Sequence, residues 1–475
     1  MTNNRGPDGH DTPMLGHETL YVGIDIGKTT HVAGFISPTL LARHQRFEHC
    51  PALTFANSRE GFRSLVDRVQ SYVPLTQVYV VLEITGHYHR ALQQYLQELD
   101  VPVYAIHVQK RQAGLLKTDK RDALGLANHL YNHLEKGIQV ADPMQAVRQL
   151  APPTEAAAGL RGMVRHRSEL IGESTQRKNK LTAIGDELFP ELTQVLRNPN
   201  SPTALALRAK FPTPQAFATA SLADLHETKG YTRLLTDAKL LELQRLATQS
   251  IGTKDQARLR GLVFEQEQLM QELALIEHHL EQLEVQMTQV VEHSREGQIL
   301  TSIPPIGPIQ AATIIAMIGN IANFERPAQL KSYFGWAPAI SQSGSTLDHV
   351  HLSPRGTRLM KQTLYLIVWQ AIRHKDCEWA RIYERLVPIK CSYDERTRRH
   401  TGRGKVIGRI AGQIVSVIYA LLKKDQETLS TLSPGMKPPA PVLYDPEVHR
   451  RHREGHYRAP ASKEEHNVLV RLPSH

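Results

Sequence analysis

The six residues VGIDIG at positions 22–27 decide how the N-terminal part of this 475-residue chain folds. They belong to Leu20–Ile26, an apolar run that contains a single acid, and such a run predicts a buried β-strand. Side chains alternate along a strand, so Asp25 is predicted on the opposite face from its two isoleucine neighbours. A carboxylate that is buried without a partner costs free energy, and Asp25 therefore needs a counter-ion.

Further predicted elements follow this strand as far as residue 145. The run VYVVLEI at Val78–Ile84 predicts a central strand buried on both faces. The other expected elements are a strand at His31–Ile36, a third strand near Leu41–Phe47, helices over Ser58–Val73 and His87–Leu99, a strand at Val101–Ile106 and a helix from Lys120 to about Leu134. Strands first, then helices alternating with strands, predict a mixed α/β sheet domain over residues 19–145, preceded by a disordered N-terminus at residues 1–18.

Three more carboxylates fall near the ends of predicted elements. Glu83 lies near the end of VYVVLEI, and Asp119 and Asp122 share one face at the start of a helix, in KTDKRDALGLA. With Asp25, this makes four acids on three elements of one domain. Mg²⁺, bound by carboxylates and completed by substrate phosphate, is the counter-ion that the set predicts. Two such ions roughly 4 Å apart can promote phosphodiester cleavage.

Other interpretations of these residues remain open. Each acid taken alone is better explained by an ordinary role, such as capping a turn or a helix, and only the set of four favours a metal site. GIDIGKTT also resembles a nucleotide-binding P-loop, but Val22 stands where G-x-x-x-x-G-K-[ST] requires glycine. It is similar, too, to the phosphate turn of actin-like sugar kinases. That class needs a second phosphate motif and an adenosine site, and a long helical segment stands in their place.

Residues 146–298 are predicted to form long helices that connect the α/β domain to the rest of the chain. From Leu269 to Val290, apolar residues recur at steps of 4, 3, 4, 3, 4 and 3, which is a heptad seam, and Gln266 fills its one polar position. Such a coiled-coil seam is buried only against another helix. It therefore predicts either an intramolecular hairpin or a dimer contact. The stretch Asn198–Pro214 is a predicted break between two helical arms.

Residues 299–425 are predicted to form a third, mainly helical unit. IPPIGPIQAATIIAMIGN at Ile303–Asn320 has the form of a helix-hairpin-helix motif, in which backbone N–H groups at the Ile-Gly turn, at Gly307, can hold a DNA phosphate. An ordinary capped helix is an equal alternative. Downstream, three serines around a glycine offer a nucleophile or a phosphate cradle, and Ser/Gly clusters are also common in loops: Ser341, Ser343 and Ser345.

The positive charge of the chain is concentrated at its C-terminal end. The formal net charge is +10. Residues 351–475 carry 23 Lys and Arg against 12 Asp and Glu, whereas the first 350 residues carry 34 against 35. This asymmetry suggests a polyanion partner, and a solvated basic, disordered tail at residues 426–475 is the alternative. The residues predicted to neutralise phosphates are Arg355, Arg358, Arg396, Arg398, Arg399, Arg403 and Lys405.

Composition excludes several classes of protein. Hydrophobic residues make up 41% of the chain and charged residues 22%, which excludes wholesale disorder and a multi-span membrane protein. The apolar stretch around Ala311–Ala322 is too short to cross a bilayer. Three scattered cysteines predict neither a disulfide framework nor a zinc site, and they favour a reducing cytosol.

In combination, these motifs resemble the insertion-sequence-110-type transposases. YVGIDIGKTTHVAGF, VVLEITGHY and LLKTDKRDALGLANHL resemble the DEDD catalytic domain of that family, which has a RuvC-like ribonuclease H fold. LTSIPPIGPIQAATIIAMIGN, FERPAQLKSYFGWAPAISQSG and SPRGTRLMKQTL resemble its C-terminal transposase domain. The resemblance covers about residues 19–425, with both domains in order and a helical linker between them.

The resemblance implies a cytoplasmic, nucleoid-associated recombinase with no membrane partner, guided by a bridge RNA that pairs with donor and target DNA. It implies a two-metal Mg²⁺ site, with Mn²⁺ as a substitute, and a homo-oligomer, either a dimer or a tetramer. Ser343, directly before Gly344, would form a transient phosphoserine link to DNA. A metal-dependent junction nuclease without covalent serine chemistry, and a catalytically dead nucleic-acid scaffold, are the alternatives. The metal-binding tetrad would be Asp25, Glu83, Asp119 and Asp122.

Overall fold

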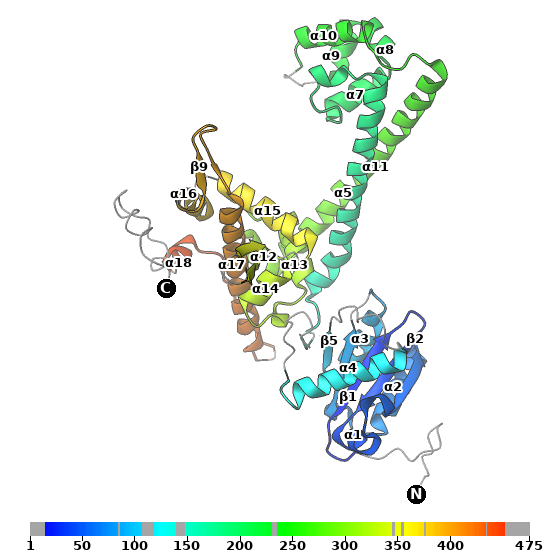
Figure 1. Cartoon of the computed structure of the whole chain (residues 1–475), viewed down its shortest axis with the longest axis vertical. Coiled ribbons are helices and arrows are strands. Elements are labelled where there is room, and N and C mark those ends of the chain that lie inside the picture. Colours follow the sequence, from blue (N-terminus) through cyan, green and yellow to red (C-terminus); the bar gives the residue numbers. More distant parts are fainter. Residues whose placement is uncertain are drawn as a thin grey trace. The chain divides into compact units, whose positions relative to one another are not determined.

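Two compact units make up the chain, residues 1–152 and residues 153–475 (Figure 1). The computed structural model describes residues 15–451, except 84–85, 107–117, 139–147, 150, 230–234, 344–346, 353–355, 375–376 and 434. Of the two ends predicted to be disordered, residues 1–14, 434 and 452–475 lie outside the described residues.

A six-stranded mixed sheet forms the centre of the first unit, in the order β3-β2-β1-β4-β5-β6. The strands are β1 (Leu20–Ile26), β2 (Thr30–Ile36), β3 (Ala52–Ala56), β4 (Val78–Glu83), β5 (Val103–Ile106) and β6 (Arg148–Gln149). β2 is antiparallel to both of its neighbours, whereas β1, β4 and β5 run parallel to one another. The mixed α/β sheet domain predicted from the sequence is confirmed.

The predicted strand near Leu41–Phe47 is wrong. Helix α1 (Pro38–His44) occupies most of that stretch, and β3 follows it. Ser37 caps α1, because its hydroxyl accepts a hydrogen bond from the N–H of Leu40 at 3.2 Å, and a proline stands at the first helical position. These local capping signals outweigh the apolar residues that suggested a strand.

Four helices accompany this sheet: α1, α2 (Arg59–Gln70), α3 (His89–Glu98) and α4 (Asp119–Leu134). α4 crosses the sheet at two facing glycines, Gly23 of β1 and Gly34 of β2. A Cβ on Gly23 would lie 2.2 Å from the carbonyl oxygen of Ala123, and one on Gly34 would lie 2.7 Å from the amide nitrogen of Leu124. The two glycines therefore let the helix backbone approach the strands at a distance that a side chain would block.

Two long helices of the second unit, α5 (Glu155–Leu188) and α11 (Gln256–His293), pack along each other within one chain (Figure 1). The predicted seam residues Leu269 and Leu273 are buried in one cluster with Leu181 and Ile184 of α5. Ion pairs flank the contact at Arg167–Glu284, Arg177–Glu272, Lys178–Glu277 and Arg258–Glu187. The hairpin alternative therefore accounts for the burial of this part of the seam.

A small helical bundle lies between α5 and α11 in the sequence and has its own core, which includes Phe189, Phe211 and Phe217. Its helices are α6 (Leu192–Val195), α7 (Pro202–Lys210), α8 (Pro214–Thr219), α9 (Leu222–Lys229) and α10 (Asp237–Thr248). The chain between the two long helices therefore folds as a compact element at their tip, as Figure 1 shows.

The largest core of the second unit lies in its C-terminal helices and takes in the beginning of α5. The helices are α12 (Arg295–Thr301), α13 (Pro308–Ile318), α14 (Pro327–Tyr333), α15 (Arg358–Arg373), α16 (Glu378–Lys390), α17 (Gly404–Ser430) and α18 (Pro446–Arg451). Two antiparallel strand pairs accompany them, β7 (Pro338–Ser343) with β8 (Leu347–Leu352) and β9 (Ser392–Asp394) with β10 (Arg399–Thr401).

Helix α17 is, within the described residues, the one helix long and apolar enough to cross a bilayer by length and composition. Half of its apolar window is buried inside the unit. Ile410, Ile414 and Ile418 are fully buried in the same core as the helices around it. This packing explains the apolar composition of α17 as that of a core helix.

Candidate active site and nucleic-acid interface

Two of the predicted metal ligands lie at the carboxyl ends of neighbouring parallel strands. Ile24 of β1 faces Leu82 of β4 in the paired register, so Asp25 and Glu83 are the next residues on the two strands. Both residues are half-buried. Neighbouring parallel strands lie about 4.8 Å apart, so the two carboxylates start from adjacent backbone positions at one edge of the sheet.

Helix α4 brings the other two acids toward the same edge. α4 runs antiparallel to β1, because Tyr21 contacts Tyr131 near the end of the helix, at 5.4 Å between ring centroids, whereas Gly23 lies against residues 123–127, nearer its beginning. Asp25 lies two residues beyond Gly23, about 6.6 Å along the strand. The first turn of α4 lies roughly 7 Å from the Gly23 contact in the same direction, at 1.5 Å per residue. Asp25 and the first turn of α4 are therefore displaced from Gly23 toward the same end of the sheet.

The beginning of α4 is fixed by a side-chain cap. The hydroxyl of Thr118 accepts a hydrogen bond from the N–H of Arg121 at 3.2 Å. This cap places Asp119 and Asp122 in the first turn of the helix, where Asp119 is exposed and Asp122 is half-buried. Acids are stabilised in a first turn by the helix dipole. Helix and strands thus bring all four predicted carboxylates to one end of the sheet.

The carboxylates do not form a closed cation cage. Within the described ranges, no group of three His, Cys, Asp or Glu side chains is close enough to hold a metal ion. Residues 107–117, which lead into α4, and Ile84 and Thr85, which follow β4, lie outside those ranges. The donor set itself, all carboxylate oxygens from three elements, has the chemistry that Mg²⁺ prefers.

The candidate nucleophile belongs to the other unit. Ser343 is the last residue of β7 and pairs with Leu347 of β8, and Ser341 pairs with His349. Ser345 and Gly344 lie outside the described residues. The β7–β8 ladder therefore places Ser343 at the end of a strand, next to the connection between the two strands.

Gly307 stands at the N-terminus of α13, as the sequence suggested, but its N–H is already occupied. It donates to Oε1 of Gln310 at 2.9 Å, and Nε2 of the same glutamine donates to Oε1 of Gln370 at 2.7 Å. Gln310 therefore supplies the acceptor that a DNA phosphate would supply at this position. A phosphate that used the N–H of Gly307 would have to displace this side chain.

Three of the seven basic residues predicted to bind phosphate lie on one hairpin. Arg396, Arg398 and Arg399 lie on the connection between β9 and β10 or on β10, and all three are exposed. Arg403 and Lys405 follow the hairpin closely in the sequence, and Arg358 is the first residue of α15. Arg355 lies outside the described residues.

An aromatic side chain that the sequence analysis missed stands on the same hairpin. Tyr393 of β9 is 56% exposed, and its ring meets that of His400 edge-on at 5.1 Å. Asp394 tightens the turn by accepting hydrogen bonds from the N–H of Arg396 and the hydroxyl of Thr397. Exposed aromatic rings among cations are typical of surfaces that bind nucleic acid. The signal available in the sequence is the position of Tyr393 three residues before Arg396, in a run of basic residues.

Comparison with known proteins covers both units. A transposase family model of the DEDD IS110 type matches residues 22–190, and the model of the transposase IS116/IS110/IS902 family matches residues 297–384. The IS110 insertion-element protein of Streptomyces coelicolor is 23% identical over 431 residues, which are 87% of this chain and 95% of that protein. The IS116 insertion-element protein of Streptomyces clavuligerus is 23% identical over 364 residues, 74% of this chain and 84% of that protein. The pilin gene-inverting protein of Moraxella bovis is 33% identical over 116 residues, which are 23% of this chain and 33% of that protein.

A mixed sheet with acids at its edge, followed by a helical unit matched to transposases, defines an enzyme that acts on DNA. The chain is a transposase, and its substrates are DNA. It belongs to the IS110 family of transposases.

Proposed function

We propose that this transposase cuts and rejoins DNA with a metal-bound carboxylate tetrad and a serine nucleophile, guided by a bridge RNA. The observation that carries the proposal is the convergence of Asp25, Glu83 and the first turn of α4 at one end of the sheet. The order β3-β2-β1-β4-β5, antiparallel at β2 only, supports a RuvC-like ribonuclease H fold for residues 19–145.

The remaining domain assignments are part of the same proposal. Residues 146–298 would form a helical, coiled-coil linker, which the seam between α5 and α11 supports. Residues 299–425 would form the transposase domain, with α12, the following turn and α13 as its helix-hairpin-helix motif. The family relation supports a guide RNA and an assembly of two or four copies.

Mg²⁺ would be held by Asp25, Glu83, Asp119 and Asp122, with Mn²⁺ as a substitute. Bound there as a pair, the ions would supply charge stabilisation for the attacking and leaving oxygens of the phosphodiester. The protein contributes the direction of the ligands. The sheet fixes the backbones of Asp25 and Glu83, and the close contact of α4 with Gly23 fixes the first turn of that helix.

In the covalent step, the Oγ of Ser343 attacks the phosphorus of the DNA backbone. An Oγ–P bond forms, the bond from phosphorus to the leaving deoxyribose oxygen breaks, and that oxygen takes up a proton as the serine hydroxyl loses one. A hydroxyl of another DNA strand reverses the step by attacking the phosphoserine. The number of phosphodiester bonds is unchanged, so strand exchange needs no energy from a nucleoside triphosphate.

Trapping the protein on DNA tests this step. With wild-type protein, guide RNA and Mg²⁺, we expect a protein–DNA adduct that survives denaturation, detected as a shifted labelled band. Ser343→Ala should lose it, because alanine has no oxygen to form the bond, and Ser341→Ala should retain it. An adduct retained in Ser343→Ala would contradict the assignment of the serine. Cleavage without any adduct in the wild type would favour a junction nuclease instead.

The β9–β10 hairpin supports a second prediction, concerning the affinity for nucleic acid. Replacing Arg396, Arg398 and Arg399 by glutamine should make duplex binding less dependent on salt. The slope of log K against log salt should become shallower by about 2.7, because each phosphate that is no longer neutralised contributes about 0.9. Removing residues 351–475 would be an unsuitable test, because α15 and α17 contribute fully buried residues to the core. Lys423→Gln, Lys424→Gln and Lys437→Gln together are the charge-matched control. Equal slopes for the two variants would exclude the hairpin as a phosphate-binding element.

A further inference from the structure

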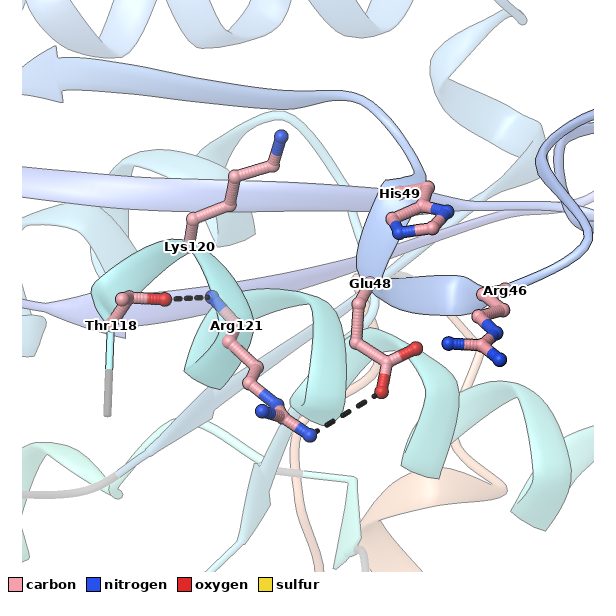
Figure 2. Close-up of a pocket in the computed structure, with 6 residues that line it drawn as sticks. All are labelled: Arg46, Glu48, His49, Thr118, Lys120 and Arg121. Carbon is pink, nitrogen blue, oxygen red and sulfur yellow. Dashed lines mark hydrogen bonds and ion pairs between the residues drawn. The ribbon is translucent and has the colours of Figure 1, made fainter. Parts of the chain in front are cut away.

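The first unit holds a cavity of about 360 Å³ beside the beginning of α4, and three of the six residues that line it are arginine or lysine (Figure 2). Its lining residues come from two segments far apart in the sequence: Arg46, Glu48, His49, Thr118, Lys120 and Arg121. Figure 2 shows the side chains of Arg46 and His49 on one segment and those of Lys120 and Arg121 on the first turn of α4. No sequence motif joins the two segments. Their residues meet only through the packing of the fold.

The charges around this cavity are only partly neutralised. Arg121 pairs with Glu48 at 3.5 Å, and Glu48 is the one acid in the lining. Arg46 and Lys120 are exposed, and no ion pair to either is found among the described residues. The same crowding acts on His44 of α1. Burial lowers the pKa of this histidine, and the positive charges of Arg43, His49 and Lys120 lower it further.

The cavity lies beside the first turn of α4, which carries two of the four acids. Lys120 and Arg121 stand between Asp119 and Asp122 in the first turn of α4, and the two acids do not line the cavity. The same turn therefore presents carboxylates to one side and cations to the other. A polyanion whose scissile phosphate lies at the carboxylates would bring neighbouring phosphates to the cations.

We propose that this cavity binds backbone phosphates of the DNA strand that is cut, directly beside the scissile position. The inference rests on the proposed function of the carboxylates, and it assigns a nucleic-acid contact to a unit whose sequence has no excess of basic residues. The first 350 residues have almost no net charge, yet the fold brings three of their cations, Arg46, Lys120 and Arg121, together at this place. Arg121, held by Glu48, would set the direction of the strand, and Arg46 and Lys120 would contact phosphates.

The test measures binding of the full-length chain to a labelled single-stranded DNA in EDTA, across a series of salt concentrations. The variant Arg46→Gln/Lys120→Gln removes two exposed cations of the cavity. Arg59→Gln/Arg63→Gln, on α2 in the same unit, removes two exposed cations elsewhere. We expect the first variant to reduce the salt slope by about 1.4, at about 0.7 for each single-strand phosphate, and the control to leave it unchanged.

Two further variants distinguish a failure of the cavity proposal from a failure of the proposed function. Asp25→Asn and Ser343→Ala should keep the wild-type slope, because binding in EDTA needs neither metal nor nucleophile. If they keep it but also keep cleavage, the proposed function fails and the cavity contact stands. An unchanged slope in Arg46→Gln/Lys120→Gln overturns the inference. A slope reduced for RNA of the same sequence and not for DNA also overturns it, since the cavity would then serve the guide.

Discussion

Replacing Asp25 by asparagine should reduce strand cleavage by about 10³-fold or more, equivalent to roughly 4 kcal/mol of transition-state stabilisation. Asparagine has nearly the shape of aspartate but lacks the charge that holds a divalent cation. Asp25 stands at the carboxyl end of β1 beside Glu83 of β4, so it belongs to the most rigid part of the proposed tetrad. The measurement is the rate of cleavage of a labelled DNA target with guide RNA and Mg²⁺.

The matched control for this prediction is Asp67→Asn, which removes one exposed acid from α2. It should leave the cleavage rate unchanged, and both variants should unfold at the wild-type temperature. Asp122→Asn should behave as Asp25→Asn does, because the two acids come from different elements and have only the metal site in common. Cleavage at the wild-type rate in either tetrad variant would rule out the carboxylate site.

The parts of the fold that the sequence predicts well are those with a strong local signal. VYVVLEI and the run around Asp25 are strands because they are apolar and β-branched, and both became central strands of the sheet. The stretch near Leu41–Phe47 was misassigned because the capping of α1 outweighs its apolar content. The facing glycines of β1 and β2, by contrast, give no signal until α4 is seen lying on them.

The candidate site shows the same division. The sequence indicates that the four acids lie near the ends of predicted elements, whereas it does not predict the β9–β10 hairpin that carries three of the basic residues. The cavity beside α4 could not, because Arg46 and Lys120 meet only through the packing of the fold. The charge count even pointed away from it, since the first 350 residues have no basic excess. Net charge over a long segment hides a local concentration of cations when acids are placed elsewhere.

Gln266, the one polar residue in the seam of α11, now has a physical explanation. Its Oε1 accepts hydrogen bonds from Nε and Nη2 of Arg208 on α7, at 3.0 and 2.7 Å, and both side chains are buried. Nη2 also donates to the carbonyl of Leu181 on α5, and the guanidinium lies against Gly185. Burial lowers the pKa of Arg208 to about 10, so the group stays charged at neutral pH. One arginine thus ties α7 to both long helices.

Gln266→Leu should therefore destabilise the second unit by about 2–4 kcal/mol, although leucine is the better residue for a heptad seam. The substitution removes the acceptor of two hydrogen bonds of a buried guanidinium, and that loss outweighs the added apolar contact. Urea unfolding followed by hydrogen exchange of the α7 amides measures the effect where it arises. Gln271→Leu, at an exposed position of the same helix, should change stability by less than about 0.5 kcal/mol.

A second substitution separates the loss of the hydrogen bonds from poor packing. In Arg208→Met/Gln266→Leu the buried charge and its acceptor are both gone, so most of the stability that Gln266→Leu removes should return. If the double variant is as unstable as Gln266→Leu, the shape of the glutamine matters and not its bond to Arg208. If Gln266→Leu alone is as stable as the wild type, the remaining hydrogen bonds of Arg208, to the carbonyls of Leu181 and Pro199 and to Oδ1 of Asn200, are sufficient to hold the charge.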